Sequence, residues 1–219
     1  MANSAKSSRT TVKRLPQKAR TDVETLYAVL DSGLLAHVGV VDHGQPIVIP
    51  VGYARDRDTL LIHGSSASRL FKLLDSGVPA CITVTLLDGL VLARSLFESS
   101  MNYRCVMVFG NATRLHGQAE VDALHVITEH LMPGRWEDAR QPNAKELKAT
   151  MTFSLPLDEY SIKVSEGPPE DLDEDLESEA GKAIWAGHIP VIERLGTPIP
   201  DLYVPLETPL PAYLATWAR

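Results

Sequence analysis

The sequence predicts a mainly β protein with peripheral helices, built as an antiparallel barrel. Six or more short apolar runs follow one another closely, and turn residues separate most of them. Helical periodicity occurs at few points between these runs, whereas a parallel sheet needs a crossover helix after most strands. With 219 residues, the chain is long enough for one substantial core and an extension.

The first half of the chain predicts two helices around three strands. Thr21 and Glu24 have the spacing of a capping box, and Gly33 offers a stop for the first helix. Alternating apolar residues then predict strands at residues 34–41, 45–54 and 59–64. Serines before an apolar stripe at residues 70–74 predict a short helix packed on the sheet.

The second half adds further strands and an extension. Asp88-Gly89 predicts a hairpin between strands at 79–87 and 89–95. We then expect a long strand at residues 103–117, an amphipathic helix at 118–131 and a short helix at 144–148. Closing strands are expected at residues 151–167, and a segment with some strand character at 183–191. The acidic stretch at 166–179 predicts an exposed loop, and the proline-rich end from Thr197 predicts an irregular tail.

These elements divide the chain into three parts. We expect a disordered leader at residues 1–13, a barrel domain at 14–165, and an acidic loop with a C-terminal extension packed on the barrel at 166–219.

Composition excludes several classes of function. The net charge is −7 and basic residues gather only near the N-terminus, so we expect no nucleic-acid partner. No apolar run approaches the length of a membrane span. Cys81 and Cys105 lack a CxxC spacing, which favours buried thiols in a reducing compartment and a cytoplasmic protein. His125, Glu129 and His130 do not form an HExxH pattern, so we predict no metal site.

Residues 61–74 carry the clearest chemical signal. A strand ends in His63-Gly64, passes through three serines and enters a helix that carries Arg69. Hydroxyls and a guanidinium at a helix start can hold a phosphate group, and a glycine lets a ligand approach the backbone. The alternative is that the serines only cap the helix and Arg69 is solvated.

Four blocks of the chain resemble the pyridoxamine 5'-phosphate oxidase-like split-barrel family. They are IVIPVGY, LLIHGSSASRLFKLLDSG, PACITVTLLDGLVLARS and SSMNYRCVMVFGNATRL, and the resemblance extends from about Arg14 to about Trp185. It implies a six-stranded split β-barrel of the FMN-binding type and a homodimer with the cofactor at its interface. It also implies three groups of site residues. The phosphate ligands would be Ser65, Ser68 and Arg69, with His63 and Gly64 beside the flavin. The flavin ring would be lined by Ile49, Pro50 and Val51, and the residues near the ring or the dimer interface would be Asn102, Tyr103 and Arg104.

The alternative for Asn102, Tyr103 and Arg104 is a strand entrance with exposed polar side chains. Within the family, the basic residues of the vitamin B6 oxidases are reduced here to Arg69, and their C-terminal substrate-phosphate motif is not visible. The nitroimidazole-resistance-like branch is therefore the nearer likeness.

The resemblance implies an FMN-dependent oxidoreductase that acts on a small molecule, and no catalytic residue is assigned. One alternative is a non-catalytic flavin- or haem-binding module, in which His63 or another histidine would serve as the axial ligand. A second alternative is a deazaflavin-dependent reductase, because the same phosphate-binding site would serve FMN and a deazaflavin.

Overall fold

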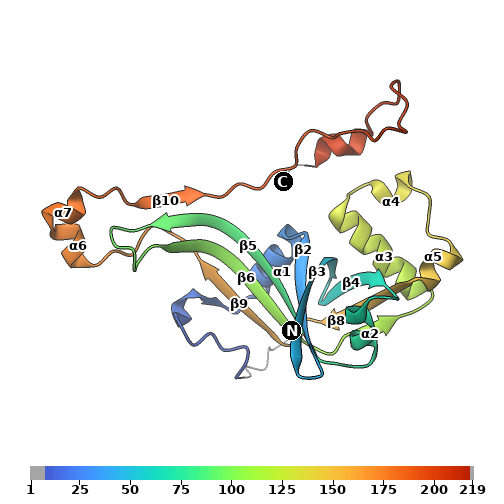
Figure 1. Cartoon of the computed structure of the whole chain (residues 1–219), viewed down its shortest axis with the longest axis horizontal. Helices are drawn as coiled ribbons and strands as arrows, with labels where there is room; N and C mark the ends of the chain where they lie inside the picture. Colours follow the sequence, from blue (N-terminus) through green and yellow to red (C-terminus); the bar gives the residue numbers. More distant parts are fainter. Residues whose placement is uncertain (1–7, 218–219) are drawn as a thin grey trace.

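The computed structural model describes residues 8–217 as a curled antiparallel sheet with short helices at its periphery (Figure 1). The strands are β1 (Ala19–Arg20), β2 (Leu35–Asp42), β3 (Gln45–Asp56), β4 (Thr59–Ser65), β5 (Ala80–Leu92), β6 (Ser100–Gly110), β7 (Thr113–Leu115), β8 (Thr150–Pro156), β9 (Tyr160–Ser165) and β10 (Gly187–Pro190). The helices are α1 (Val23–Ser32), α2 (Arg69–Asp75), α3 (Gln118–Leu131), α4 (Arg135–Asp138), α5 (Ala144–Lys148), α6 (Asp173–Glu177) and α7 (Glu179–Lys182). Two 3-10 helices complete the list, η1 (Pro16–Lys18) and η2 (Ala212–Thr216).

The strands pair in the order β1-β9-β6-β5-β2-β3-β4-β8-β7, and β10 pairs with β5. Every ladder is antiparallel, which confirms the predicted mainly β, antiparallel class. The number of strands differs from the six that the resemblance to a split barrel implies. The sheet has ten strands, and within residues 8–217 no ladder joins β8 to β9, so the sheet stays open there. The prediction missed β1 and β7 as separate strands because they have only two and three residues, whereas β10 lies within the predicted segment at 183–191.

The core lies inside the curl of the sheet. Side chains alternate between the faces of a strand, so Ala36, Val38 and Val40 of β2 are buried while Leu35 and His37 face outward. Helices α1 and α2 each bury three apolar side chains in the same core, which are Leu26, Val29, Leu30, Leu70, Phe71 and Leu74. The inner face is therefore filled by the chain itself, and a ligand has to bind elsewhere.

The predicted hairpin at Asp88-Gly89 is wrong. Strand β5 runs through both residues, and its register against β6 shifts between Leu87 and Gly89, which makes a β-bulge. Gly89 has a packing reason, because a Cβ there would lie 2.9 Å from the carbonyl oxygen of Ile189 in β10. The actual turn follows Leu92, and the predicted strand at 103–117 is likewise divided into β6 and β7.

The acidic stretch at 166–179 is more ordered than the predicted loop. It contains α6 and the start of α7, and Asp171 is buried where its carboxylate accepts hydrogen bonds from the backbone and side chain of Arg94. At the other end of the chain, residues 1–7 of the expected leader lie outside the described residues. Arg9 is bonded to Glu159 in the turn between β8 and β9.

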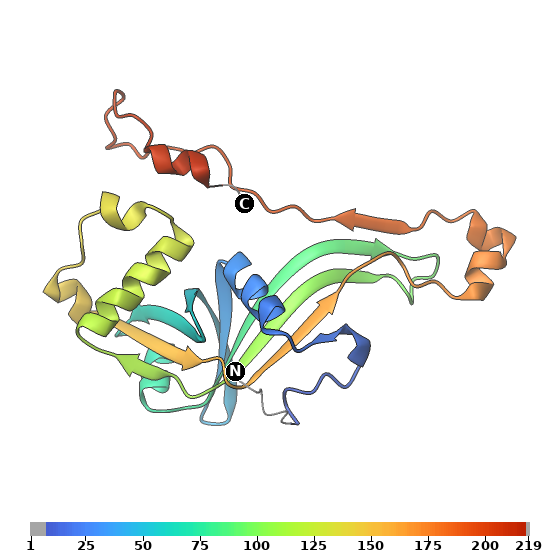
Figure 2. The ribbon, with the colours of Figure 1, turned by 180° about the vertical axis from the view of Figure 1, so that it is seen from behind.

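After β10, residues 191–211 form an extended segment that we call the C-terminal arm. Figures 1 and 2 show it crossing above the sheet from the α6–α7 end toward α3 and α4. Beyond the arm, Tyr213 donates to Asp138 over 2.8 Å and Trp217 donates to the carbonyl oxygen of Pro133 over 2.9 Å. No helix in the described part of the chain combines the length and apolar character that a membrane span needs.

Candidate functional site

The predicted site residues on β3 and β4 divide between the two faces of the sheet. Val51 and Gly64 are on the inner face, where Val51 is buried and Gly64 meets Phe71. By alternation, Ile49 is on the inner face too, at the margin of the core. Pro50, His63 and Ser65 are on the outer face, which the structure therefore makes the candidate ligand surface.

Beside Pro50 the outer face is apolar and open, whereas α3 covers Ala54 and Leu61 further along β3 and β4. Pro50 pairs with His37 of β2, and both are exposed. Leu35, Val41 and Val48 share this face with exposed fractions of 51%, 55% and 60%. Such a contiguous apolar surface on a soluble protein indicates that a ligand or a protein partner covers it.

His63 is the titratable group with the most distinctive environment in the site. It pairs with Thr152 of β8, and its Nδ1 atom is buried with no hydrogen-bond partner among residues 8–217. Burial lowers the pKa of its imidazole below the ordinary value of 6.5. Burial therefore favours the neutral form of the ring and leaves Nδ1 without a hydrogen-bond partner in the described chain.

The serines between β4 and α2 build a tight turn. The amide of Ser68 donates to the carbonyl oxygen of Ser65 over 2.9 Å, and the Ser65 hydroxyl accepts from the amide of Ala67. Ser68 is the N-cap residue of α2, yet its side chain makes no capping hydrogen bond within the described chain. The alternative that the serines serve only as caps therefore fails for Ser68.

Arg69 begins α2 on the surface beside this turn. Its Nε donates to Asp42 Oδ2 over 2.6 Å, and 66% of its side chain is exposed. Asp42 lies at the end of β2, and its side chain is only 12% exposed, so it holds the guanidinium beside the end of this strand. Arg69 is therefore both ion-paired and largely exposed, and the N–H groups on the exposed side of the guanidinium can still donate to an anion.

Gly64 has a packing role that the sequence did not reveal. A Cβ atom at Gly64 would lie 2.1 Å from Cε2 of Phe71, so the ring already fills the space beside the glycine. The close approach expected for a ligand is made by a core side chain instead.

Asn102, Tyr103 and Arg104 lie on β6, and three strands separate β6 from β4. A single protomer does not bring them to His63. Asn102 is buried and donates to the carbonyl oxygen of Gly167, and Arg104 makes two hydrogen bonds to Asp88 of 2.7 and 2.9 Å. The hydrogen bonds to Asp88 raise the pKa of Arg104. The alternative, an exposed polar side chain at a strand entrance, is therefore wrong for Asn102.

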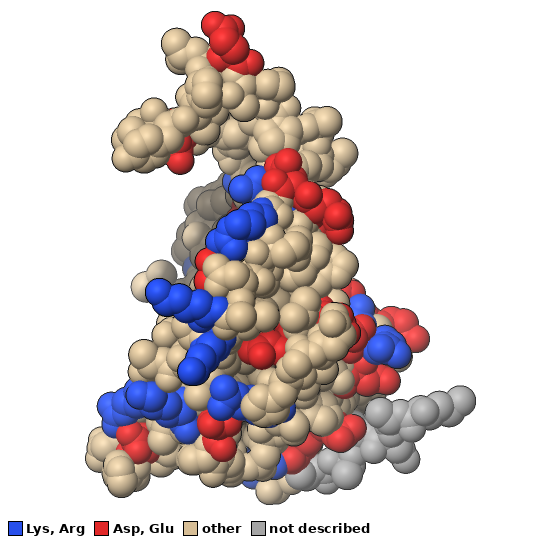
Figure 3. All heavy atoms as spheres, turned by 90° about the vertical axis from the view of Figure 1, so that its right-hand side faces the viewer, with Lys and Arg blue, Asp and Glu red and all other residues tan. Residues whose placement is uncertain are grey.

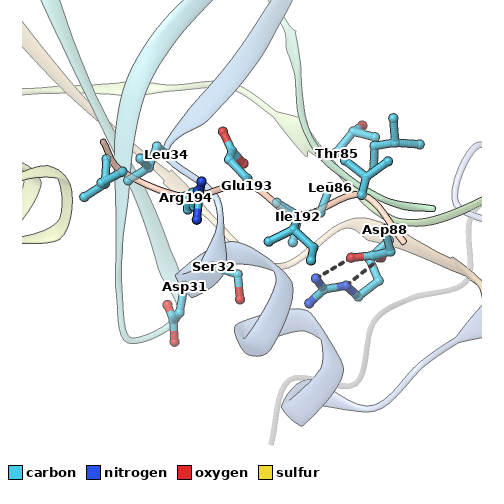
Figure 4. Close-up of a pocket in the computed structure, with 13 residues that line it drawn as sticks. Asp31, Ser32, Leu34, Thr85, Leu86, Asp88, Ile192, Glu193 and Arg194 are labelled. Atoms are coloured by element: carbon cyan, nitrogen blue, oxygen red, sulfur yellow. Dashed lines mark hydrogen bonds and ion pairs between the residues drawn. The ribbon is translucent and has the colours of Figure 1, made fainter. Parts of the chain in front are cut away.

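Sequence reasoning missed a cavity of about 1050 Å³ that none of Pro50, His63 and Ser65 lines (Figure 4). The end of α1, the bulged part of β5 and the first residues of the C-terminal arm line it. Arg104 is the one predicted site residue in its wall. No motif marked this place, because an irregular tail carries no sequence signal for where it docks.

The residues that suggested a metal motif have internal partners. His125 packs against Trp136, His130 is bonded to the carbonyl oxygen of Gly33, and Glu129 accepts from the amides of Gly134 and Trp136. These two amide bonds, with that of Gly134 the larger cause, lower the pKa of Glu129. No group of three metal-ligating side chains is found in residues 8–217.

The curled antiparallel sheet with short peripheral helices defines a small, mainly β protein. Residues 22–164 match the family model described as pyridoxamine 5'-phosphate oxidase, and the chain belongs to this family. This confirms the family resemblance predicted from the four sequence blocks.

The chain is similar to a number of solved structures, and three of them show the range of similarity. The FAD and haem binding protein from Mycobacterium smegmatis is 38% identical with a TM-score of 0.87, over 92% of this chain and 97% of that one. The flavocytochrome Anf3 from Azotobacter vinelandii is 42% identical with a TM-score of 0.89, over 97% of both chains. A candidate 5-nitroimidazole antibiotic resistance protein from Bacteroides thetaiotaomicron shares the fold, at 22% identity and a TM-score of 0.57 over 67% of this chain and 86% of that one. No curated protein matches the chain.

Proposed function

We propose that the protein is a flavin-binding redox protein that exchanges electrons with a small molecule. The observation that carries this proposal is the polar turn at Ser65–Arg69 beside an open apolar face, in a chain of this family. Two proteins that are 38% and 42% identical over nearly the whole chain are described as FAD and haem binding and as a flavocytochrome. A bound flavin would supply the hydride and electron transfer, and the protein would supply binding and orientation.

The residues present fit a flavin. The Ser68 hydroxyl and the exposed side of the Arg69 guanidinium are donors for a phosphate group, and Asp42 holds the guanidinium in position. Pro50 and its neighbours on the outer face offer an apolar surface for a ring system. His63 would lie at the edge of this surface, where its neutral imidazole can share a hydrogen bond.

The proposal covers FMN and FAD, because the phosphate next to the ribityl chain is common to both. The resemblance to the oxidase family favours FMN, whereas the description of the Mycobacterium smegmatis protein favours FAD. A deazaflavin with the same phosphate would occupy the same seat.

We place the flavin between two copies of the chain. The candidate surface is an open face, and Pro50, His63 and Ser65 do not line the described cavity, so one protomer does not enclose a ligand at these residues. A second copy on the apolar outer face would exclude water and complete the site. Both cysteines are free, which fits a reducing compartment such as the cytoplasm.

Haem is the second candidate cofactor, either beside the flavin or in its place. The relatives described as a haem binding protein and a flavocytochrome favour it. Haem iron needs a protein ligand, and His63 offers a neutral imidazole whose Nδ1 has no partner in the described chain.

The absorption spectrum of the purified protein and the mass of the small molecule it releases test this assignment. Flavin absorption bands and a released flavin support the proposal. A Soret band would indicate bound haem, either together with the flavin or in its place. A protein that carries no chromophore and binds neither FMN nor FAD on titration contradicts it.

Arg69→Ala tests the phosphate seat. Hydrogen bonds to charged groups contribute about 1.5–3 kcal/mol, so we expect the flavin dissociation constant to rise by roughly 10- to 150-fold. Fluorescence titration of the flavin-free protein measures it. Lys72→Ala is the matched control, because Lys72 is an exposed cation one turn further along α2. Equal flavin affinity in the Arg69→Ala and wild-type proteins would remove Arg69 from the site.

A further inference from the structure

The C-terminal arm carries large apolar side chains that touch little of their own chain. The exposed fractions of five of them are 80% for Ile192, 91% for Ile199, 83% for Leu202, 83% for Tyr203 and 102% for Leu206. Scattered exposed apolar residues are ordinary on a protein surface. Five such residues within fifteen positions of one extended segment are a patch, and a patch of this kind marks an interaction surface.

The arm is fixed at both of its ends, so its course is defined. At the first end, β10 pairs with β5 and the amide of Val191 donates to the carbonyl oxygen of Asp88 over 3.0 Å. At the second end, Tyr213 and Trp217 bond to the segment around α4. Figures 1 and 2 show the span between these two attachments standing off from the sheet.

The composition of this region suits a permanent protein partner. Residues 187–217 contain only four charged side chains, which are Glu193, Arg194, Asp201 and Glu207. Figure 3 shows this projection as mostly uncharged above a body that carries many charged side chains. Six prolines, at positions 190, 198, 200, 205, 209 and 211, restrict the backbone and lower the entropy lost when the segment is buried. Apolar, weakly charged surfaces are typical of obligate homodimers.

We propose that the C-terminal arm clasps a second copy of this chain. The inference rests on the homodimer proposed above and adds a second contact to it, made by residues other than the proposed flavin ligands. An arm that is fixed on its own protomer and apolar along its free span can be covered by a subunit that lies beneath it. In a two-fold dimer each subunit would then hold the other by the same surface.

The area available is consistent with this arrangement. Burial of one large apolar side chain removes roughly 60–120 Å² from water, judged from its transfer free energy. Five side chains on each of two arms would bury roughly 600–1200 Å², whereas specific interfaces bury about 1200–2000 Å². The arms would thus supply a substantial part of the interface, and the exposed outer face around Val48 would supply the remainder.

The double variant Leu202→Asp with Leu206→Asp tests the clasp. Each substitution occurs twice in a dimer, so we expect its dissociation constant to rise at least about 100-fold. Sedimentation equilibrium of the flavin-loaded protein measures this constant. Thr208→Asp, which places the same charge on the same arm, is the matched control. Flavin content and the thermal unfolding midpoint show whether each variant is folded.

A third variant separates this inference from the proposed function. Val48→Glu charges the outer sheet face and should also weaken the dimer. One possible result is that the wild type is a dimer, that Val48→Glu dissociates it and that the Leu202→Asp/Leu206→Asp variant does not. This result would show that the clasp is wrong and that the dimer is correct. A wild type that is monomeric with flavin bound overturns both the dimer and the clasp but leaves the flavin assignment intact. Weakening by the arm variant, without effect of Thr208→Asp, supports the clasp.

Discussion

Gly64→Ala separates packing from ligand binding at the most suggestive glycine of the site. The added Cβ would lie 2.1 Å from Cε2, 2.6 Å from Cζ and 2.7 Å from Cδ2 of Phe71. Carbon atoms need about 3.5 Å, so the ring would have to move by about 1.4 Å. Phe71 is 3% exposed and its ring lies against that of Phe153 with centroids 6.0 Å apart, so it has little room to move.

We therefore expect Gly64→Ala to destabilise the flavin-free protein by about 3 kcal/mol, at the upper end of the cost of overpacking. For a chain of this size that corresponds to a decrease of about 6–12 °C in the unfolding midpoint. Thermal and urea unfolding of the flavin-free protein measure the loss.

Phe71→Leu in the same chain should relieve the clash, because leucine lacks the ring atoms that the new methyl group meets. The double variant is then expected to be more stable than the sum of the two single effects by at least about 1 kcal/mol. Additive effects would refute the packing argument. So would a Gly64→Ala protein of unchanged flavin-free stability that binds flavin poorly, because that result would assign the glycine to the ligand.

Two further predictions concern the scaffold. Tyr53 is fully buried, and its hydroxyl donates to the carbonyl oxygen of Leu30 over 2.6 Å. Tyr53→Phe should therefore lower the free energy of unfolding, measured by urea titration, by about 1–3 kcal/mol. An unchanged urea midpoint would contradict this expectation. The hydrogen bond from Arg140, with that from the Asn143 amide, lowers the pKa of Glu146 from 4.5 to about 2. A carboxyl whose folded pKa is depressed stabilises the protein fully above its unfolded pKa and loses this contribution as the pH falls toward the folded value. The stability difference between wild type and Glu146→Gln should therefore shrink between pH 4.5 and pH 2, and a difference that is constant across this range would contradict it.

The elements that sequence reasoning predicted well are those in which one local signal has one structural meaning. The alternation in residues 34–64 predicts β2, β3 and β4, and the helical periodicity of residues 118–131 coincides with α3. Asp88-Gly89 failed because the same dipeptide suits a hairpin turn and a bulge. The choice is made by the backbone of β10, which is about a hundred residues away and passes over Gly89.

The site shows the same limit. Sequence order made Ile49, Pro50 and Val51 look like one unit, but the alternation of a strand sends Pro50 to the outer face and Val51 into the core. The position of Arg69 beside Asp42 joins a helix start to a strand end, a contact across 27 positions that no local spacing encodes. Family resemblance could name these residues, and only the fold could sort them by face.

The open outer face and the exposed arm have one physical cause. The inner face of the curled sheet is already filled by α1, α2 and the strand side chains, so the core has no room for Val41, Val48 or the apolar residues of the arm. Leaving them in water would forfeit the burial energy that stabilises folded proteins and would expose the chain to aggregation. A second subunit would cover both surfaces at once. In this arrangement the same contacts that exclude water from the flavin would also bury the apolar surface that a single chain leaves exposed.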